Sequence, residues 1–170
     1  MMEHCGVILE ESEVEILRGL EKLVGSPIPF KRILGNHILG FNADNNHVVG
    51  LGLFKCGIGA LPTGVTELTY LETLILQQND LEELPDSFWN LTNLVDLNLT
   101  NNRITKLSPK IQHLTKLEYL YLNANKLASL PYQLGDLPNL KELYIRGNPL
   151  QEDTNEVVAK LRKKKCRVSK

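Results

Sequence analysis

The sequence has few of the features on which secreted, disulfide-bonded or membrane-spanning proteins depend. Its 170 residues include only three cysteines, which lie far apart at Cys5, Cys56 and Cys166. An odd number of distant cysteines does not indicate a disulfide framework. No apolar run approaches the roughly 18 residues that a transmembrane helix needs. These absences argue against a small disulfide scaffold and against an integral membrane protein.

The N-terminal segment lacks the basic residues that precede the apolar core of a secretory signal peptide, so we do not expect one. A net charge of −1 and a hydrophobic content of 42% are ordinary for one soluble globular domain. The charge is unevenly placed. Residues 1–25 contain six glutamates, whereas residues 160–170 contain seven lysines or arginines and no acid.

Motifs that would indicate catalysis or metal binding are also missing. The sequence contains neither a G-x-x-x-x-G-K-[ST] phosphate loop nor a G-x-S-x-G nucleophile turn. Among the four histidines, only His4 has a possible metal ligand beside it, and this neighbour, Cys5, is too close in sequence and too near the terminus to predict a site. We therefore predict a protein that is not an enzyme and that has no cofactor and no metal.

The sequence does contain a repeat of 23 residues. Three segments begin at Leu71, Leu94 and Leu117, and two more units fit the same spacing from Val48 and Leu140. The units follow the pattern L-x-x-L-x-L-x-x-N-x-L-x-x-L-P, with two further apolar positions before the next unit. A fixed period over five units is typical of repeat architectures, in which each unit contacts only its neighbours.

This pattern resembles the leucine-rich repeat proteins, in particular the intracellular, Ras-suppressor-like subclass whose 23-residue repeats end in Leu-Pro. The resemblance implies an α/β solenoid, a right-handed βα superhelix with a curved parallel sheet and a helical cap at each end. Extracellular members usually carry cysteine clusters in their caps. None is present here, which predicts a reducing, cytoplasmic compartment. Residues 47–62 are also similar to the entry segments of prokaryotic leucine-rich repeat proteins, archaeal ones included.

We divide the chain into an N-terminal cap at 1–47, five repeats at 48–150, and a C-terminal capping helix with a basic tail at 151–170. Apolar spacing predicts an amphipathic helix over residues 12–24, with Ser12 and Glu15 as its capping box and Gly25 as its left-handed C-terminal residue. The polar tract at 43–46 predicts the turn of a β-hairpin that leads into the sheet.

A second amphipathic helix is expected near the C-terminus, where Val157, Val158 and Leu161 supply an apolar face. The cations that follow favour the helix dipole and suit a solvated tail. Contact of this tail with nucleic acid or with an anionic membrane is the alternative interpretation.

Most residues of each repeat have structural roles. In the unit that starts at Leu94, alternation and period place five side chains inward, at Leu94, Leu97, Leu99, Ile104 and Leu107. The ninth position is Asn79, Asn102, Asn125, Asn148 and, in the first unit, Cys56. An amide there can bond the backbone of adjacent coils, so we interpret this column, including a buried Cys56, as structural. Trp89 falls on the outer side and is expected to lie flat on the surface.

The third, fifth and seventh positions of each strand should face the concave, solvent side of the sheet. In the C-terminal half they bring three tyrosines next to charged and amide side chains. We predict that this patch binds a partner, and it consists of Asp96, Asn98, Tyr119, Tyr121, Asn123, Glu142, Tyr144 and Arg146. Tyrosine and arginine are enriched in binding hot spots, although stacked tyrosines also simply suit strands. Phe54, Ile75 and Gln77 form a weaker second patch towards the N-terminus.

These observations favour a non-enzymatic module that binds a partner protein on its concave face. Asp96 and Glu142 face the same side, but they lie two strands apart, about 10 Å. Nothing beside them forms a cleft, so a glycosidase-like carboxylate pair is not indicated. The resemblance implies a regulator or scaffold in signalling, with a small GTPase, a phosphatase or another signalling enzyme as partner. Two alternatives stay open: an adaptor that uses the basic tail, and a structural subunit of a larger complex.

Overall fold

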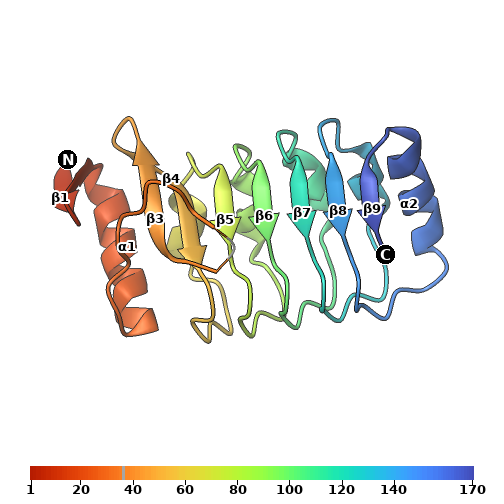
Figure 1. Ribbon diagram of the computed structural model, residues 1–170, viewed down its shortest axis with the longest axis horizontal. Coiled ribbons are helices and arrows are strands. Elements are labelled where there is room, and N and C mark those ends of the chain that lie inside the picture. Colours follow the sequence, from red (N-terminus) through yellow and green to blue (C-terminus); the bar gives the residue numbers. More distant parts are fainter. Residues whose placement is uncertain (36) are drawn as a thin grey trace.

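The protein is an α/β solenoid, as the repeat predicts. The structure is a computed structural model and describes residues 1–35 and 37–170. Figure 1 shows one sheet, from β3 to β9, between a helix at each end of the molecule. The helices are α1 (Glu11–Val24) and α2 (Thr154–Lys163). The strands are β1 (Met2–His4), β2 (Val7–Leu9), β3 (Leu39–Asp44), β4 (His47–Leu53), β5 (Thr73–Ile75), β6 (Asp96–Asn98), β7 (Tyr119–Tyr121), β8 (Glu142–Tyr144) and β9 (Arg167–Ser169).

The main sheet has the order β3-β4-β5-β6-β7-β8-β9. Strand β3 is antiparallel to β4, and every later neighbour is parallel. The expected hairpin is therefore present, and its turn is tighter than predicted. The turn consists of Asn45 and Asn46, both with a positive φ, of 48° and 67°. Asparagine tolerates this left-handed conformation better than most residues, which explains why the chain turns there.

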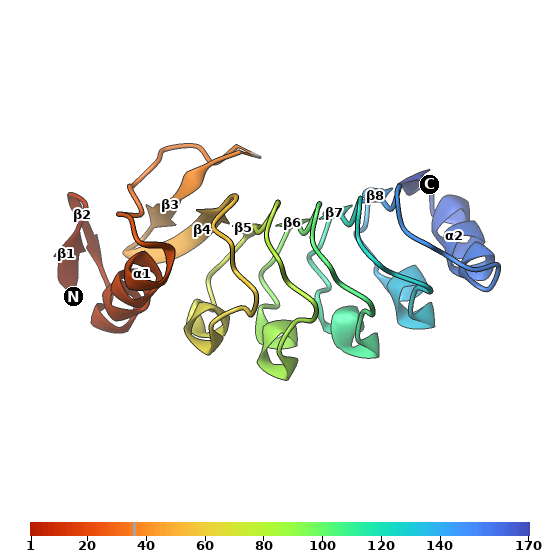
Figure 2. The same cartoon turned by 90° about the horizontal axis from the view of Figure 1, so that it is seen from below.

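Short 3-10 helices return the chain along the convex side, on the opposite side of the core from the sheet (Figure 2). They are η1 (Thr63–Glu67), η2 (Asp86–Asn90), η3 (Pro109–His113) and η4 (Tyr132–Asp136). The predicted inward side chains are buried: Leu94, Leu99 and Ile104 have no exposed surface, and Leu107 is 7% exposed. One continuous core thus joins all the coils, as expected for units that cannot fold alone.

The asparagine column is structural, as predicted. The Nδ2 atom of Asn102 donates to the carbonyls of Leu76 and Leu99, at 2.9 and 3.0 Å, and its Oδ1 atom accepts from the backbone N–H of Leu81 at 3.1 Å. Each amide therefore links its own coil to the preceding one. In the first unit, Cys56 is half-buried rather than fully buried, and burial raises the pKa of its thiol.

The N-terminal cap begins with a small hairpin, β1–β2, followed by α1. The helix starts one residue earlier than predicted, and its N-cap residue is Glu10, whose side chain forms no capping hydrogen bond. The predicted capping box of Ser12 and Glu15 is therefore wrong, because Ser12 already lies within the first turn. Gly25 does end the helix in the left-handed conformation, with φ of 71°. The buried carboxylate of Glu13 ties the helix to the sheet by accepting from the Val48 N–H at 2.9 Å.

At the other end, α2 covers the last coil, but the basic segment after it is not a free tail. Residues Arg167–Ser169 form β9, which pairs in parallel with β8 and extends the sheet by one strand. The Cys166 side chain that precedes β9 is buried under the edge of the core, 4% exposed. The expectation of a solvated tail overlooked this strand, since three residues containing one apolar side chain carry little strand signal.

Candidate functional site

The concave face carries the predicted rows of side chains. Parallel register aligns Asp96 with Tyr119 and Glu142, and Asn98 with Tyr121 and Tyr144. Because β9 continues this register, Arg167 and Ser169 join the two rows. Sequence analysis missed these last two positions.

The N-terminal half of this face is covered by the chain itself. Residues 29–35 and 37–38 arch over the side of the sheet away from the 3-10 helices (Figure 2). Two glycines permit this close approach. A Cβ atom on Gly52 would lie 2.5 Å from the carbonyl oxygen of Ile38, and one on Gly50 would lie 2.6 Å from a Leu34 methyl carbon. The sequence places small residues on the concave side here because another layer of chain lies on them.

This cover removes the weaker of the two predicted patches. Ile75 is only 2% exposed and Gln77 is 9% exposed, so neither is available to a partner. Phe54 is half-buried, and its ring packs edge-on against His37 at 4.9 Å. The patch prediction at Phe54, Ile75 and Gln77 is therefore wrong, since it considered the sheet without the segment that lies over it.

The C-terminal half stays open and carries the tyrosines. The rings of Tyr121 and Tyr144 stack face to face, with centroids 4.9 Å apart and planes 10° apart. Tyr119 lies on the next row, where the Lys141 ammonium sits 5.9 Å from its ring centroid. All three tyrosines are partly exposed. Their positions on adjacent strands of a packed sheet fix them before any partner arrives, which limits the conformational entropy that binding would cost.

A half-buried acid, Asp96, adjoins this stack. Burial raises the pKa of Asp96 to about 6. One carboxylate oxygen of Asp96 is inaccessible to water and has no hydrogen-bond partner among the described residues. Burial raises the pKa of Tyr121 to about 12, and the negative charge of Asp96 makes a smaller contribution to this rise. A buried acceptor without a donor is unfavourable for the ionised carboxyl, in agreement with the raised pKa of Asp96.

The other charged groups are partly paired. The Tyr144 hydroxyl donates to Glu142 at 2.5 Å, and the Arg167 guanidinium lies 3.8 Å from the same carboxylate. This hydrogen bond to Glu142, followed by burial, raises the pKa of Tyr144. Arg146 is exposed, and no ion pair joins it to an acid in the part of the chain described here.

The two predicted amides have mainly structural contacts. Asn98 is buried, donates to Gln77 at 3.3 Å and accepts from the Thr100 N–H at 3.0 Å. Asn123 accepts from the Arg146 N–H at 2.9 Å. The structure thus brings six of the eight predicted residues together as an accessible group, which we call the tyrosine patch. Its members are Asp96, Tyr119, Tyr121, Glu142, Tyr144 and Arg146.

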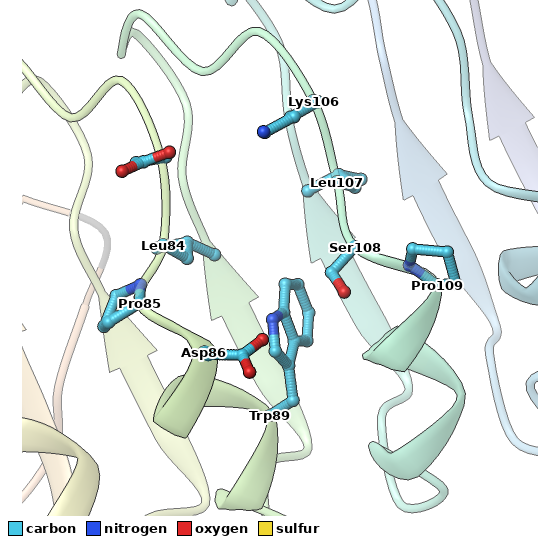
Figure 3. Close-up of a pocket in the computed structure, with 9 residues that line it drawn as sticks. Leu84, Pro85, Asp86, Trp89, Lys106, Leu107, Ser108 and Pro109 are labelled. Carbon is cyan, nitrogen blue, oxygen red and sulfur yellow. The ribbon is translucent and has the colours of Figure 1, made fainter.

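A separate hollow of about 420 Å³ lies on the other side of the molecule, beside the loops that lead into η2 and η3. Figure 3 shows the Trp89 ring standing between Leu84 and Pro85 of one unit and Ser108 and Pro109 of the next. Trp89 is 3% exposed, so the prediction that it lies flat on the surface is wrong. It packs edge-on against Phe88 and acts as a core residue of the convex side.

Residues 44–167 match the family model described as a leucine-rich repeat region. This match covers most of the chain and coincides with the coils seen in the structure. The chain belongs to the leucine-rich repeat family. Proteins of this family are generally non-enzymatic binding modules, and their solenoid is commonly a protein-protein interaction surface.

Solved structures support the fold. A leucine-rich repeat protein of Leptospira interrogans is 36% identical, with a TM-score of 0.66 over 71% of this chain and 30% of its own. A plant ice-binding protein is 26% identical, with a TM-score of 0.70 over 85% of this chain and 50% of its own. The chain therefore spans half or less of the length of these two proteins.

The leucine-rich repeat ectodomain of the receptor kinase SOBIR1 from Arabidopsis thaliana is similar over nearly its whole length. It is 21% identical, with a TM-score of 0.67 over 89% of this chain and 90% of its own. At this identity the similarity shows the fold alone. A search of curated proteins found no match. None of the described helices has both the length and the apolar character required to cross a membrane.

Proposed function

We propose that the protein is a binding module that holds a partner protein on the tyrosine patch, at the C-terminal half of its concave face. The observation that carries this proposal is the rigid Tyr121–Tyr144 stack next to the half-buried Asp96. Aromatic and arginine side chains in such a setting are the ones whose truncation costs binding most, about 2 kcal/mol or more.

The charges indicate what kind of surface the partner presents. Asp96 is half-buried and forms no ion pair with the described residues, and the adjacent tyrosine faces attract cations, so a lysine or arginine of the partner suits this end of the patch. Arg146 at the other edge suits an acid. We propose a partner that offers both signs of charge within one small contact area.

The wider role rests on the resemblance to the cytoplasmic, Ras-suppressor-like subclass. It favours a regulator or scaffold in signalling, located in the cytoplasm, whose partner is a small GTPase or another signalling enzyme. The 23-residue units ending in Leu-Pro support this subclass, as does the absence of a cysteine cluster in the sequence of either cap.

The test is affinity capture with a double variant, Tyr121→Ala with Tyr144→Ala. Both rings are solvent-facing, so the fold should persist and partner capture should be lost. The matched control is Tyr70→Ala with Tyr132→Ala, because these two tyrosines are 50% and 57% exposed and lie outside the patch. Capture that survives the first variant, or is lost equally in the control, would reject the patch as the binding surface.

The alternative function, an adaptor that contacts nucleic acid or an anionic membrane through the basic C-terminal segment, is less well supported because several of its cations already have partners. Lys160 pairs with Asp136 at 2.6 Å, Lys164 donates to the carbonyl of Asp136 at 3.1 Å, and Lys170 donates to Asn155 at 2.8 Å. Fewer cations then remain for phosphates. Salt discriminates the two functions: binding driven by these cations should fall steeply between low and moderate salt, whereas binding by the tyrosine patch should change little. A structural subunit would instead co-purify with a stable partner through another surface.

A further inference from the structure

The N-terminal hairpin brings together three side chains that are distant from the tyrosine patch. His4 ends β1, Cys5 begins the turn to β2, and Glu21 lies on α1. One potential metal-ligand atom from each, a ring nitrogen, the sulfur and a carboxylate oxygen, lies within 4.8 Å of the other two. Sequence analysis rejected His4 and Cys5 because they are neighbours. The third residue could not be found from spacing, since it belongs to a different element.

The geometry fits a tetrahedral ion. The Nε2 atom of His4 is 3.3 Å from the Oε1 atom of Glu21. Nitrogen and oxygen ligands at about 2.0–2.2 Å from one zinc ion stand about 3.3 Å apart when the ion is tetrahedral. Cys5 is exposed, and the contact of its sulfur with the Ile28 carbonyl, at 3.7 Å, is weak enough for a third metal bond to replace.

Burial of the histidine is an independent indication. His4 is only 8% exposed, and its Nε2 atom, which faces Glu21, has no hydrogen-bond partner of acceptable geometry among the described residues. Buried polar atoms are almost always satisfied, and an exception calls for an explanation such as an ion. The imidazole ring is fixed in place by Phe41, whose ring centroid lies 5.7 Å away.

The other two groups are also held in position. Glu21 Oε1 accepts from the backbone N–H of Ile28 at 2.9 Å, the kind of outer contact that orients a ligating carboxylate. Cys5 has φ of 51° and is followed by Gly6 at 78°. A two-residue turn of this kind favours asparagine or glycine, so a cysteine there is conformationally unfavourable. The conformation directs its sulfur towards the Ile28 carbonyl, 3.7 Å away, on the same side as Glu21.

We propose that His4, Cys5 and Glu21 bind one divalent transition-metal ion of the zinc class, with water in the fourth position. A thiolate, an imidazole and a carboxylate together suit zinc rather than magnesium or calcium, which prefer oxygen ligands throughout. The exposed side of Cys5 leaves room for the water. The ion joins the β1–β2 hairpin to α1 and so stabilises the cap that covers the open end of the solenoid.

The experiment uses the full chain, reduced and treated with a chelator, to which zinc or cobalt is then added. We expect one ion per chain by titration calorimetry, and an absorption band of thiolate-to-cobalt charge transfer. The melting temperature should rise by roughly 5–10 °C when free zinc reaches a hundred times its Kd.

Two conservative variants test the ligands. Cys5→Ser should abolish the charge-transfer band, and Glu21→Gln, which keeps an acceptor for the Ile28 N–H, should weaken binding by more than the roughly 10–100-fold that loss of an outer contact causes. Cys56→Ser is the matched control, because its thiol is also partly accessible yet lies outside the cluster, and it should change nothing. Unfolding of each variant without metal shows separately whether the cap itself is intact.

The proposal is overturned if the wild type binds no ion or shows no thiolate band. It is also overturned if Cys5→Ser binds as well as the wild type, or if Cys56→Ser abolishes the band. In those cases the His4–Glu21 contact is only a polar contact within the cap.

Discussion

The two halves of the concave face have the same scaffold and opposite environments. In the N-terminal half, Gly50 and Gly52 lie against the segment that precedes β3, and Ile75 on the next strand is only 2% exposed. In the C-terminal half, the equivalent positions carry tyrosines and charged groups that face solvent. The comparison teaches that a repeat determines where side chains point, while the residues outside the repeat determine which of them are accessible.

The largest effect is expected from a change to the scaffold that both halves share. Asn102→Ala removes three hydrogen bonds to buried backbone groups of two coils. Unpaired backbone groups of this kind cost about 1 kcal/mol or more each, so the free energy of unfolding should fall by about 3 kcal/mol. Urea denaturation of the wild type and the variant measures this difference in the free energy of unfolding. Asn139→Ala is the control, because this exposed amide donates one bond to the Thr115 carbonyl, and its loss should cost less than about 1 kcal/mol.

A change of intermediate size should disturb only the covered half. The Cβ of Gly52→Ala would meet the Ile38 backbone, which cannot rotate away as a side chain can. We expect a loss of about 2 kcal/mol, with faster hydrogen exchange in residues 31–35 and 37–38. Gly59→Ala is the control, since a Cβ there meets nothing within 4 Å. Equal exchange in both variants would show that the segment does not rest on Gly52.

A smaller change is expected in the open half, where a substitution of Asp96 should raise the free energy of unfolding rather than lower it. The folded-state pKa of Asp96 is about 6, above its usual value of 3.8, so the folded state binds the proton more tightly than the unfolded chain. The Asp96 carboxyl therefore makes its full contribution to the free energy of unfolding below about pH 4, and this contribution is lost as the pH rises through about 6.

Asp96→Asn should remove this pH dependence and stabilise the protein at pH 7 by about 1 kcal/mol, a value reduced for partial exposure. Partner binding should weaken in the same variant, since the carboxylate is the proposed acceptor for a cation. Thermal unfolding of both proteins from pH 4 to 8 checks the sign. A variant that is less stable than the wild type at pH 7 would show that Asp96 is well satisfied in the folded protein.

The parts of the fold that follow from the 23-residue period could be predicted from the sequence. The inward leucines, the asparagine column and the concave rows all follow from 23-residue spacing and strand alternation, and the structure confirms them. Contacts between a repeat and a non-repeating segment have no such signal. The segment that lies against Gly50 and Gly52, and the Glu21 carboxylate beside His4, both come from parts of the chain distant in sequence.

Short sequence motifs led to wrong predictions at three places. Ser12 and Glu15 match a capping box, yet backbone geometry starts α1 one residue earlier. Arg167–Ser169 contains one apolar side chain, yet it pairs with β8 because the sheet there offers an unpaired edge. Trp89 occupies an outer position of its unit, yet its ring is 3% exposed and packs edge-on against Phe88.

The most direct test of the binding surface is oxidative footprinting of the tyrosines, with and without the captured partner. The chain has five tyrosines: Tyr119, Tyr121 and Tyr144 lie in the tyrosine patch, and Tyr70 and Tyr132 lie outside it. Our account predicts that the partner lowers the oxidation of Tyr121 and Tyr144 and leaves Tyr70 and Tyr132 unchanged. Protection of Tyr70 or Tyr132, with Tyr121 and Tyr144 still reactive, would contradict it.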